Sequence, residues 1–174
     1  MRALLLSLTT FLFLSACSVL PTSPPAPVVY DLGPPSSSGQ LNAAVSLQSV
    51  DSPDWLDSTA MLYRIGDPNR VQSYRDARWA AQPSMLLSER LQQRLAPQGN
   101  VRPLSLALDV FEQRFSSASS SEVCVRARAK FAGRERVFEV KVAGGPDAAS
   151  GARAFAKASD ALIEQVLEWT ATIQ

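Results

Sequence analysis

An uncharged apolar run, followed at once by a cysteine and then by prolines, opens the chain and limits which residues can build a folded domain. Arg2 is the one charge before residue 17, residues 3–14 are mostly apolar, and residues 14–17 read Leu-Ser-Ala-Cys. This order is typical of a secretory signal peptide. A helix that crosses a bilayer needs about 20 apolar residues, and this run is shorter. The sequence therefore predicts that residues 1–16 are removed on export.

Residues 14–17 also look like a bacterial lipobox. In that motif the cysteine thiol receives diacylglycerol, the peptide is cut before the cysteine, and the new amino group is acylated, often with palmitate. We therefore expect Cys17 to anchor the chain to a membrane, because each buried CH₂ stabilises attachment by about 0.8 kcal/mol. The alternative is cleavage after Ala16 with Cys17 left as a free thiol. Ser18, rather than Asp, follows the cysteine, which favours the periplasmic side of the outer membrane under the Gram-negative sorting rule.

A proline-rich segment separates Cys17 from the rest of the chain. Six of the 12 prolines lie in it: Pro21, Pro24, Pro25, Pro27, Pro34 and Pro35. Proline-rich chain prefers an extended conformation that rises about 3.1 Å per residue, so this segment has the composition of a semi-rigid tether. We therefore divide the chain into a signal peptide (1–16), a lipidated cysteine with its tether (17–40) and a domain (41–174). Within the tether, residues 28–32 are an apolar island that predicts a short strand or a surface strap.

The ionisable side chains exclude several kinds of chemistry. The chain has no histidine, which removes Ser-His-Asp and Cys-His nucleophile systems and His-ligated zinc. Its 17 Lys and Arg residues nearly balance 16 Asp and Glu residues, whereas a nucleic-acid-binding protein clusters cations against phosphates. The sequence also lacks the usual phosphate-binding, nucleophile and CxxC motifs. We therefore expect no enzyme, no cofactor or metal, and no nucleic-acid partner.

The periodicity of apolar residues after residue 40 predicts an α+β domain. Alternating or short apolar runs favour strands at 42–50, 60–65, 71–74, 104–110, 123–131 and 136–142. The Gly-Asp-Pro-Asn sequence at 66–69 favours a hairpin loop. Apolar residues on one helical face indicate helices from Pro83 to about Ala96 and from Asp147 to Trp169. The simplest arrangement is an antiparallel sheet with two helices packed on one face.

Alternation assigns faces to two of these strands. Every second residue from Leu104 to Val110 is apolar, which places Phe111, Gln113 and Phe115 on the opposite face. In the next strand Cys124 lies between valines, and it has no intramolecular disulfide partner once Cys17 is lipidated. We expect its side chain to be a half-buried small apolar group, the alternative being a reactive thiol.

Four aromatic residues, Trp55, Tyr63, Tyr74 and Trp79, surround the predicted hairpin and the start of the first helix. Aromatic residues are enriched at the energetically important positions of protein interfaces, so these four are candidates for contact with a partner. The alternative is that they belong to the core of a small domain, where Trp and Tyr are commonly found.

Three cations, Arg126, Arg128 and Lys130, alternate along one predicted strand face, with Lys141 or Arg136 beside them. We call this set the basic stripe. Anionic headgroups attract clustered cations by about 1 kcal/mol each, so the stripe could meet lipid headgroups or an acidic partner loop. The alternative is an ordinary solvated strand face.

Several short segments together resemble the ABC-type transport auxiliary lipoproteins over residues 28–170. Besides the lipobox and tether, they are Tyr-Asp-Leu at 30–32, Pro-Asp-Trp-Leu-Asp at 53–57, Met-Leu-Tyr-Arg at 61–64, Trp-Ala-Ala-Gln-Pro at 79–83, and the Ala-rich helix ending at Trp169. The resemblance implies a fold similar to the N-terminal domain of TolB. It also implies an outer-membrane accessory role beside an ABC permease, its ATPase and a mammalian-cell-entry (MCE) domain protein that move lipids or other hydrophobic molecules. It implies no catalytic residue.

Three functions remain open at this point. The first is a non-enzymatic docking component for such a transporter, in which several copies could form a ring. The second is a direct lipid carrier, which needs an enclosed apolar cavity. The third is a regulator of cell-wall synthesis, because other outer-membrane lipoproteins with TolB-like domains activate periplasmic synthases.

Overall fold

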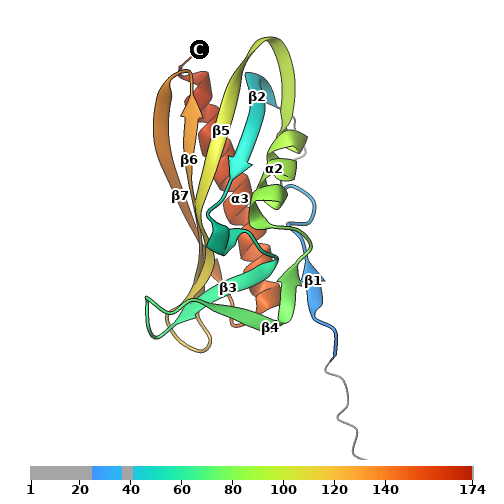
Figure 1. The fold of residues 1–174 in the computed structure, drawn as a ribbon, viewed down its shortest axis with the longest axis vertical. Helices are drawn as coiled ribbons and strands as arrows, with labels where there is room; N and C mark the ends of the chain where they lie inside the picture. Colours follow the sequence, from blue (N-terminus) through green and yellow to red (C-terminus); the bar gives the residue numbers. More distant parts are fainter. Residues whose placement is uncertain (1–24, 37–40, 174) are drawn as a thin grey trace, which may run out of the picture.

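The computed structural model describes residues 25–36 and 41–173. The signal peptide, Cys17 and most of the tether lie outside these residues, so their processing and lipidation stay predictions. The described chain forms one mixed β-sheet with two α-helices packed against it (Figure 1).

The sheet has seven described strands. Their order is β1-β4-β3-β5-β6-β7, and β2 pairs with β5 beside this path. Their bounds are β1 (Val28–Tyr30), β2 (Leu41–Asp51), β3 (Ala60–Ile65), β4 (Gln72–Trp79), β5 (Leu95–Phe115), β6 (Ser121–Phe131) and β7 (Arg134–Gly144). Each strand that the apolar periodicity predicts is present, and β4 and β5 extend further than expected.

β5 is the central strand because it pairs along both edges. One edge carries β2 and then β3, and β6 runs antiparallel along the other edge. The β1–β4, β2–β5 and β3–β5 pairs are parallel, whereas β3–β4, β5–β6 and β6–β7 are antiparallel. The α+β prediction is therefore confirmed, but the sheet is mixed rather than wholly antiparallel. A parallel pair needs a long connection, and the chain between β2 and β5 supplies one.

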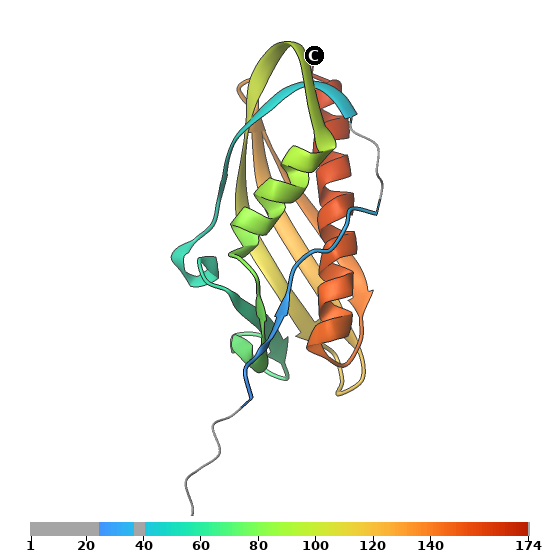
Figure 2. The same cartoon turned by 90° about the vertical axis from the view of Figure 1, so that its right-hand side faces the viewer.

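Both α-helices cover the same face of the sheet (Figure 2). α2 (Pro83–Arg94) begins with proline, whose missing N–H has no intrahelical partner in the first turn anyway. α3 (Ala148–Ala171) packs across β6 and β7, and the Asp147 carboxylate caps it by accepting the backbone N–H of Ser150 at 2.7 Å. The two predicted helices are confirmed. α2 ends before Ala96 because β5 already begins at residue 95.

The core lies between the helices and the sheet, and three aromatic rings form its centre. Trp79 of β4 meets Phe111 of β5 and Phe155 of α3 edge to face, with ring centroids 5.5 and 5.1 Å apart. Phe111 and Phe155 stack at 4.3 Å. Each of these pairs contributes about 0.5–1.5 kcal/mol beyond the burial of its surface. Aromatic side chains therefore fill the space between the two layers.

A β-bulge at Asp109 resets the alternation along β5. Leu108 and Val110 pair with neighbouring residues of β6, which leaves Asp109 as an extra residue. An extra residue turns the side chains that follow it to the other face. Phe111 and Gln113 therefore share the helix-covered face with Leu108 and are buried, so the expectation that they lie opposite is wrong.

The segment after β1 is fastened to both helices. Arg90 of α2, whose side chain is 2% exposed, donates to the carbonyls of Leu32 and Gly33 at 3.0 and 2.6 Å. Its Nε lies 2.7 Å from an oxygen of Asp160 on α3, and the other Asp160 oxygen accepts the backbone N–H of Ser36. Residues 31–36 therefore form a strap across the helical layer.

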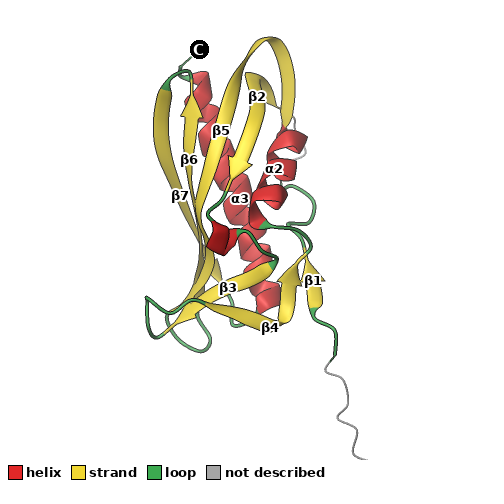
Figure 3. Cartoon of the chain, viewed as in Figure 1, coloured by secondary structure: helices red, strands yellow, loops and turns green. Residues whose placement is uncertain are grey.

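The other face of β5, β6 and β7 carries no helix. In Figures 1 and 3 these strands lie in front of α3 and face the viewer. We call this surface the open sheet face. The short 3₁₀ helix η2 (Asp54–Leu56) and the β3–β4 hairpin border it.

Candidate functional site

The open sheet face is hollowed by a cleft of about 530 Å³, which we call the Trp55 cleft. Three parts of the chain line it: η2, the β3–β4 hairpin at 65–69, and the second half of β5. The side chains that matter below are Trp55, Arg64, Val110, Glu112 and Arg114. Apolar surface with a few converging polar groups is the usual composition of a binding site.

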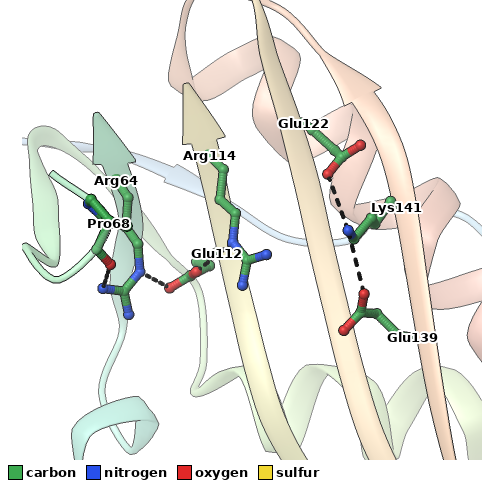
Figure 4. A network of polar contacts seen from close by, with 7 residues as sticks. All are labelled: Arg64, Pro68, Glu112, Arg114, Glu122, Glu139 and Lys141. Carbon is green, nitrogen blue, oxygen red and sulfur yellow. Dashed lines mark hydrogen bonds and ion pairs between the residues drawn. The ribbon is translucent and has the colours of Figure 1, made fainter. Parts of the chain in front are cut away.

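Glu112 organises the polar floor of the cleft. Its side chain is 2% exposed, and its two oxygens accept hydrogen bonds from Arg64 Nε at 2.8 Å and Arg114 Nε at 2.7 Å. Arg64 also donates through Nη1 to the Pro68 carbonyl at 2.7 Å. Figure 4 shows the carboxylate held between the two guanidinium groups. A buried carboxylate needs such partners because an unpaired charge away from water is very unfavourable.

The two arginines leave a cationic surface above this carboxylate. The hydrogen bond to Glu112 raises the pKa of Arg114 above its ordinary value, so the guanidinium stays charged. Arg114 uses its Nε on Glu112, and its side chain is 41% exposed. Its outer N–H groups are therefore accessible, and Figure 4 shows that they point away from the Glu112 carboxylate.

Trp55 forms an edge of the cleft because of the way η2 is anchored. The neighbouring Leu56 is buried at 1% exposure and fixes the turn in the core, whereas Trp55 is 47% exposed. The Asp57 N–H donates to the Asp54 carbonyl and closes the turn. Large aromatic side chains are highly buried on average, so a half-exposed tryptophan is an informative surface feature.

The other predicted contact aromatics are less accessible. Trp79 is 1% exposed and belongs to the core, so the prediction of a partner contact is wrong for this residue. Tyr63 and Tyr74 are half-buried, with ring centroids 4.8 Å apart, and Tyr63 also meets Phe115 at 5.9 Å. Partner contact stays a prediction for Trp55, Tyr63 and Tyr74.

A buried polar network lies at the same end of β5. The Gln113 carbonyl accepts the Tyr74 hydroxyl at 3.0 Å, and its amide donates to Ser121 Oγ at 2.7 Å and to the Gly145 carbonyl at 3.0 Å. Burial, followed by the nearby Tyr63 and two carboxylates, raises the pKa of Tyr74 to about 12. The Tyr74 hydroxyl is therefore a hydrogen-bond donor at neutral pH. The network joins β4, β5, β6 and the chain before α3.

Acidic neighbours neutralise much of the basic stripe. Arg128 donates to both Asp109 oxygens, at 3.1 and 3.0 Å, and Lys130 lies 3.4 Å from Glu135. Arg126 is exposed and has no ion pair within the described ranges. The structure thus gives a face of mixed charge on which Arg126 stands out, and a role in binding stays a prediction for all three cations.

The cations named beside the stripe separate onto two faces. Lys141 is on the open sheet face, 3.9 Å from Glu122 and 3.5 Å from Glu139 (Figure 4). Arg136 is on the opposite face, where its guanidinium carbon lies 5.2 Å from the centroid of the Phe138 ring. Arg136 is therefore not part of the stripe, because it alternates with Lys141 along β7.

Cys124 is fully buried, and burial raises the pKa of its thiol. The thiol therefore stays protonated at neutral pH, and the side chain packs as a small apolar group. Residues 25–36 and 41–173 contain no group of three cysteine or acidic side chains that could hold a metal ion. Neither α2 nor α3 combines the length and apolar character that a membrane crossing requires.

Sequence reasoning missed Arg64, Glu112 and Arg114. Glu112 and Arg114 are two charged residues in a strand that also carries buried apolar residues. This pattern could have indicated an ion pair, since buried charges are almost always paired. The second arginine that binds Glu112, Arg64 on β3, could not be found in the same way. Arg64 lies 48 residues before Glu112, and only the parallel pairing of β3 with β5 places it beside Arg114.

Comparison with known proteins agrees with this fold. A solved structure of protein XCC0632 from Xanthomonas campestris, described by the family model DUF330, is similar with a TM-score of 0.67 and 19% identity, over 82% of this chain and 94% of that one. Another, described as an uncharacterized protein, has a TM-score of 0.61 and 15% identity, over 86% of this chain and all of that one, 100%. No curated protein matches the chain significantly.

The family model described as ABC-type transport auxiliary lipoprotein component matches residues 30–169. These residues run from the end of β1 almost to the end of α3, so the match includes the whole cleft and the core beneath it. The resemblance seen in the short aromatic segments is confirmed, while the expected likeness to TolB stays a prediction. The chain belongs to the ABC-type transport auxiliary lipoprotein family.

Proposed function

We propose that the chain is a non-enzymatic outer-membrane lipoprotein that docks the periplasmic end of an MCE-type ABC transport system at the outer membrane. Such a system moves lipids or other hydrophobic molecules across the Gram-negative envelope. The observation that carries the proposal is the family match over residues 30–169. The Leu-Ser-Ala-Cys sequence at 14–17 and the proline-rich tether that follows support the membrane anchor.

The Trp55 cleft is better suited to binding than to catalysis. General acid and base groups need an accessible proton and a pKa near the working pH. Glu112 is instead buried with both oxygens bound to arginine, so neither oxygen is free to exchange a proton with a ligand. Exposed Trp55 beside Arg114 is a combination that protein interfaces favour.

The packing of the domain favours docking over lipid carriage. A carrier needs an interior cavity for acyl chains. Here Trp79, Phe111 and Phe155 occupy the centre between sheet and helices, in direct ring contact with one another. The Trp55 cleft lies instead on the open sheet face. Within residues 25–36 and 41–173, no feature points to the third alternative, regulation of cell-wall synthesis.

The proposal is tested by affinity purification of the full-length lipoprotein from detergent-solubilised envelopes after mild crosslinking. Mass spectrometry identifies the partners, and light scattering during size exclusion gives the number of copies. Recovery of an MCE-domain protein with several copies of the lipoprotein supports the docking role. Recovery of a monomer that carries phospholipid and no protein partner contradicts it and favours the carrier.

A further inference from the structure

The Trp55 cleft has an apolar wall and a cationic edge within one surface. Trp55 is 47% exposed, and Val110 lies on the cleft floor. Arg114 offers its outer N–H groups beside them, because only its Nε is bound to Glu112. Tryptophan and arginine are the residue types most enriched where protein interfaces gain their binding energy.

A ligand that enters this cleft meets the Arg114 guanidinium, whose side chain is 41% exposed. The Glu112 carboxylate lies beneath the surface with both oxygens bound to arginine, so it is not available to a ligand. Arg126 is paired directly across from Val110 on β6 and is exposed without an ion pair in the described ranges. Three acidic residues lie near these cations. Asp67 is on the hairpin, where its carboxylate accepts the Asn69 N–H at 2.8 Å. Glu122 is across from Arg114, Glu139 is across from Arg126, and both are paired with Lys141.

The rest of the open sheet face is already neutralised. Arg128 is bound to Asp109 through two hydrogen bonds, and Lys130 is paired with Glu135. Such exposed ion pairs are typical of the polar rim of an interface and contribute little to the affinity for a partner. Among the cations of this face, Arg114 keeps N–H groups that are not bound to a carboxylate and also lines the same cleft as Trp55.

We infer that the Trp55 cleft binds an acidic segment of the transporter's periplasmic protein, with a carboxylate on Arg114 and an apolar side chain against Trp55 and Val110. A carboxylate matches the forked geometry of a guanidinium and can accept two parallel N–H bonds. Glu112 holds Arg114 in place before binding, which reduces the ordering entropy that association must overcome. This inference rests on the proposed docking function, since it names the surface and the chemistry of the partner.

The affinity of the full-length lipoprotein for the purified MCE-domain protein, both in detergent, tests the inference. Trp55→Ala and Arg114→Gln should each raise Kd at least about tenfold, as interface hot spots do. The matched control is Arg128→Gln, an arginine on the same face with its own carboxylate partner, which should change Kd less than about twofold. Added salt should weaken the wild type more than Arg114→Gln, because the variant lacks the charge that is screened.

The two hypotheses fail in different ways. Wild-type lipoprotein that does not bind the MCE-domain protein contradicts the docking function. Wild-type binding that Trp55→Ala and Arg114→Gln leave unchanged overturns the cleft assignment while docking stands. Because Trp55 is half-exposed, its removal leaves the core intact, and unchanged thermal unfolding of Trp55→Ala confirms that lost affinity is local.

A photo-crosslinking amino acid in place of Trp55 identifies the occupant directly. The expected product is a crosslink to a peptide of the MCE-domain protein that has Asp or Glu within a few residues of the crosslinked position. A crosslink to phospholipid, or to a peptide of a second lipoprotein copy, overturns the inference and assigns the cleft to a membrane or to self-association.

Discussion

At the scale of single residues, the most consequential feature is a carboxylate that serves two arginines. Glu112 binds Arg64 on β3 and Arg114 on its own strand, so it links the hairpin to the sheet and holds both guanidinium groups in place. Local sequence could not reveal this arrangement. It also could not separate Trp55 from Trp79, because only tertiary packing leaves one half-exposed and buries the other.

Glu112→Gln should destabilise the fold by about 2 kcal/mol, because it leaves two arginines side by side without their shared counter-charge. The loss of unfolding free energy is smaller than for a wholly buried cluster of charges, because Arg64 and Arg114 are partly exposed and can be hydrated. Urea unfolding measures the change. Glu135→Gln is the control: its partner Lys130 is 71% exposed, so the loss should stay below about 0.5 kcal/mol. Equal effects of the two substitutions would contradict the structural role of Glu112.

The raised pKa of Tyr74 predicts how stability depends on alkaline pH. The unfolded chain releases the tyrosine proton near its ordinary pKa of 10.0, whereas the folded chain keeps it until about 12. Between these values the unfolded state binds fewer protons, so stability falls as pH rises. The stabilisation that Tyr74 contributes is fully present below pH 10 and is lost as the pH rises to about 12. Tyr74→Phe removes this titration, and urea unfolding across the range should therefore show a shallower decline than in the wild type.

At the scale of elements, periodicity reveals strands and helices but not their partners. The predicted strand segments and both predicted helices are present because each has an apolar pattern of its own. The parallel pairing of β2 and β3 with one edge of β5 depends on contacts between distant segments, which a local pattern does not encode. The bulge at Asp109 is a single extra residue, and it was enough to reverse the predicted faces of Phe111 and Gln113.

The close approach of α3 to β5 gives a prediction at this scale. A β-carbon on Gly151 would collide with the Oε1 of Gln113, so Gly151→Ala should destabilise the protein by about 2 kcal/mol. In an unconstrained helix the same change stabilises by about 1 kcal/mol. Urea unfolding of a double-mutant cycle with Gln113→Ala separates the two effects. In the Gln113→Ala variant, Gly151→Ala should no longer destabilise the protein. If it still lowers the free energy of unfolding by the same amount, the clash with Gln113 is not the cause.

At the scale of the whole molecule, the proposed anchor at Cys17 predicts which end of the domain lies near the membrane. The described chain enters β1 at the lower end of the molecule in Figures 1 and 2, and the C-terminal end of α3 lies at the opposite end. If Cys17 is acylated as proposed, a proline-rich chain rising about 3.1 Å per residue would reach from it to Pro25 over roughly 25 Å. Arg90 and Asp160 fix the strap at 31–36 to α2 and α3, so the chain that follows β1 is held against the helical layer.

The anchor itself gives the last prediction, because the cysteine and the residue after it have separable roles. Cys17→Ala removes the acylated thiol and should move the protein from the membrane to the soluble fraction or leave it unprocessed. Ser18→Asp keeps the lipid and should shift the protein toward the inner membrane under the Gram-negative sorting rule. Density-gradient fractionation of envelopes with immunodetection measures both, and Ser46→Asp, at an exposed site on β2, is the control for an added charge. If Cys17→Ala remains attached to the membrane, the lipobox interpretation is wrong. If Ser18→Asp remains in the outer membrane while Cys17→Ala is released, the anchor is confirmed and a determinant other than residue 18 directs its sorting.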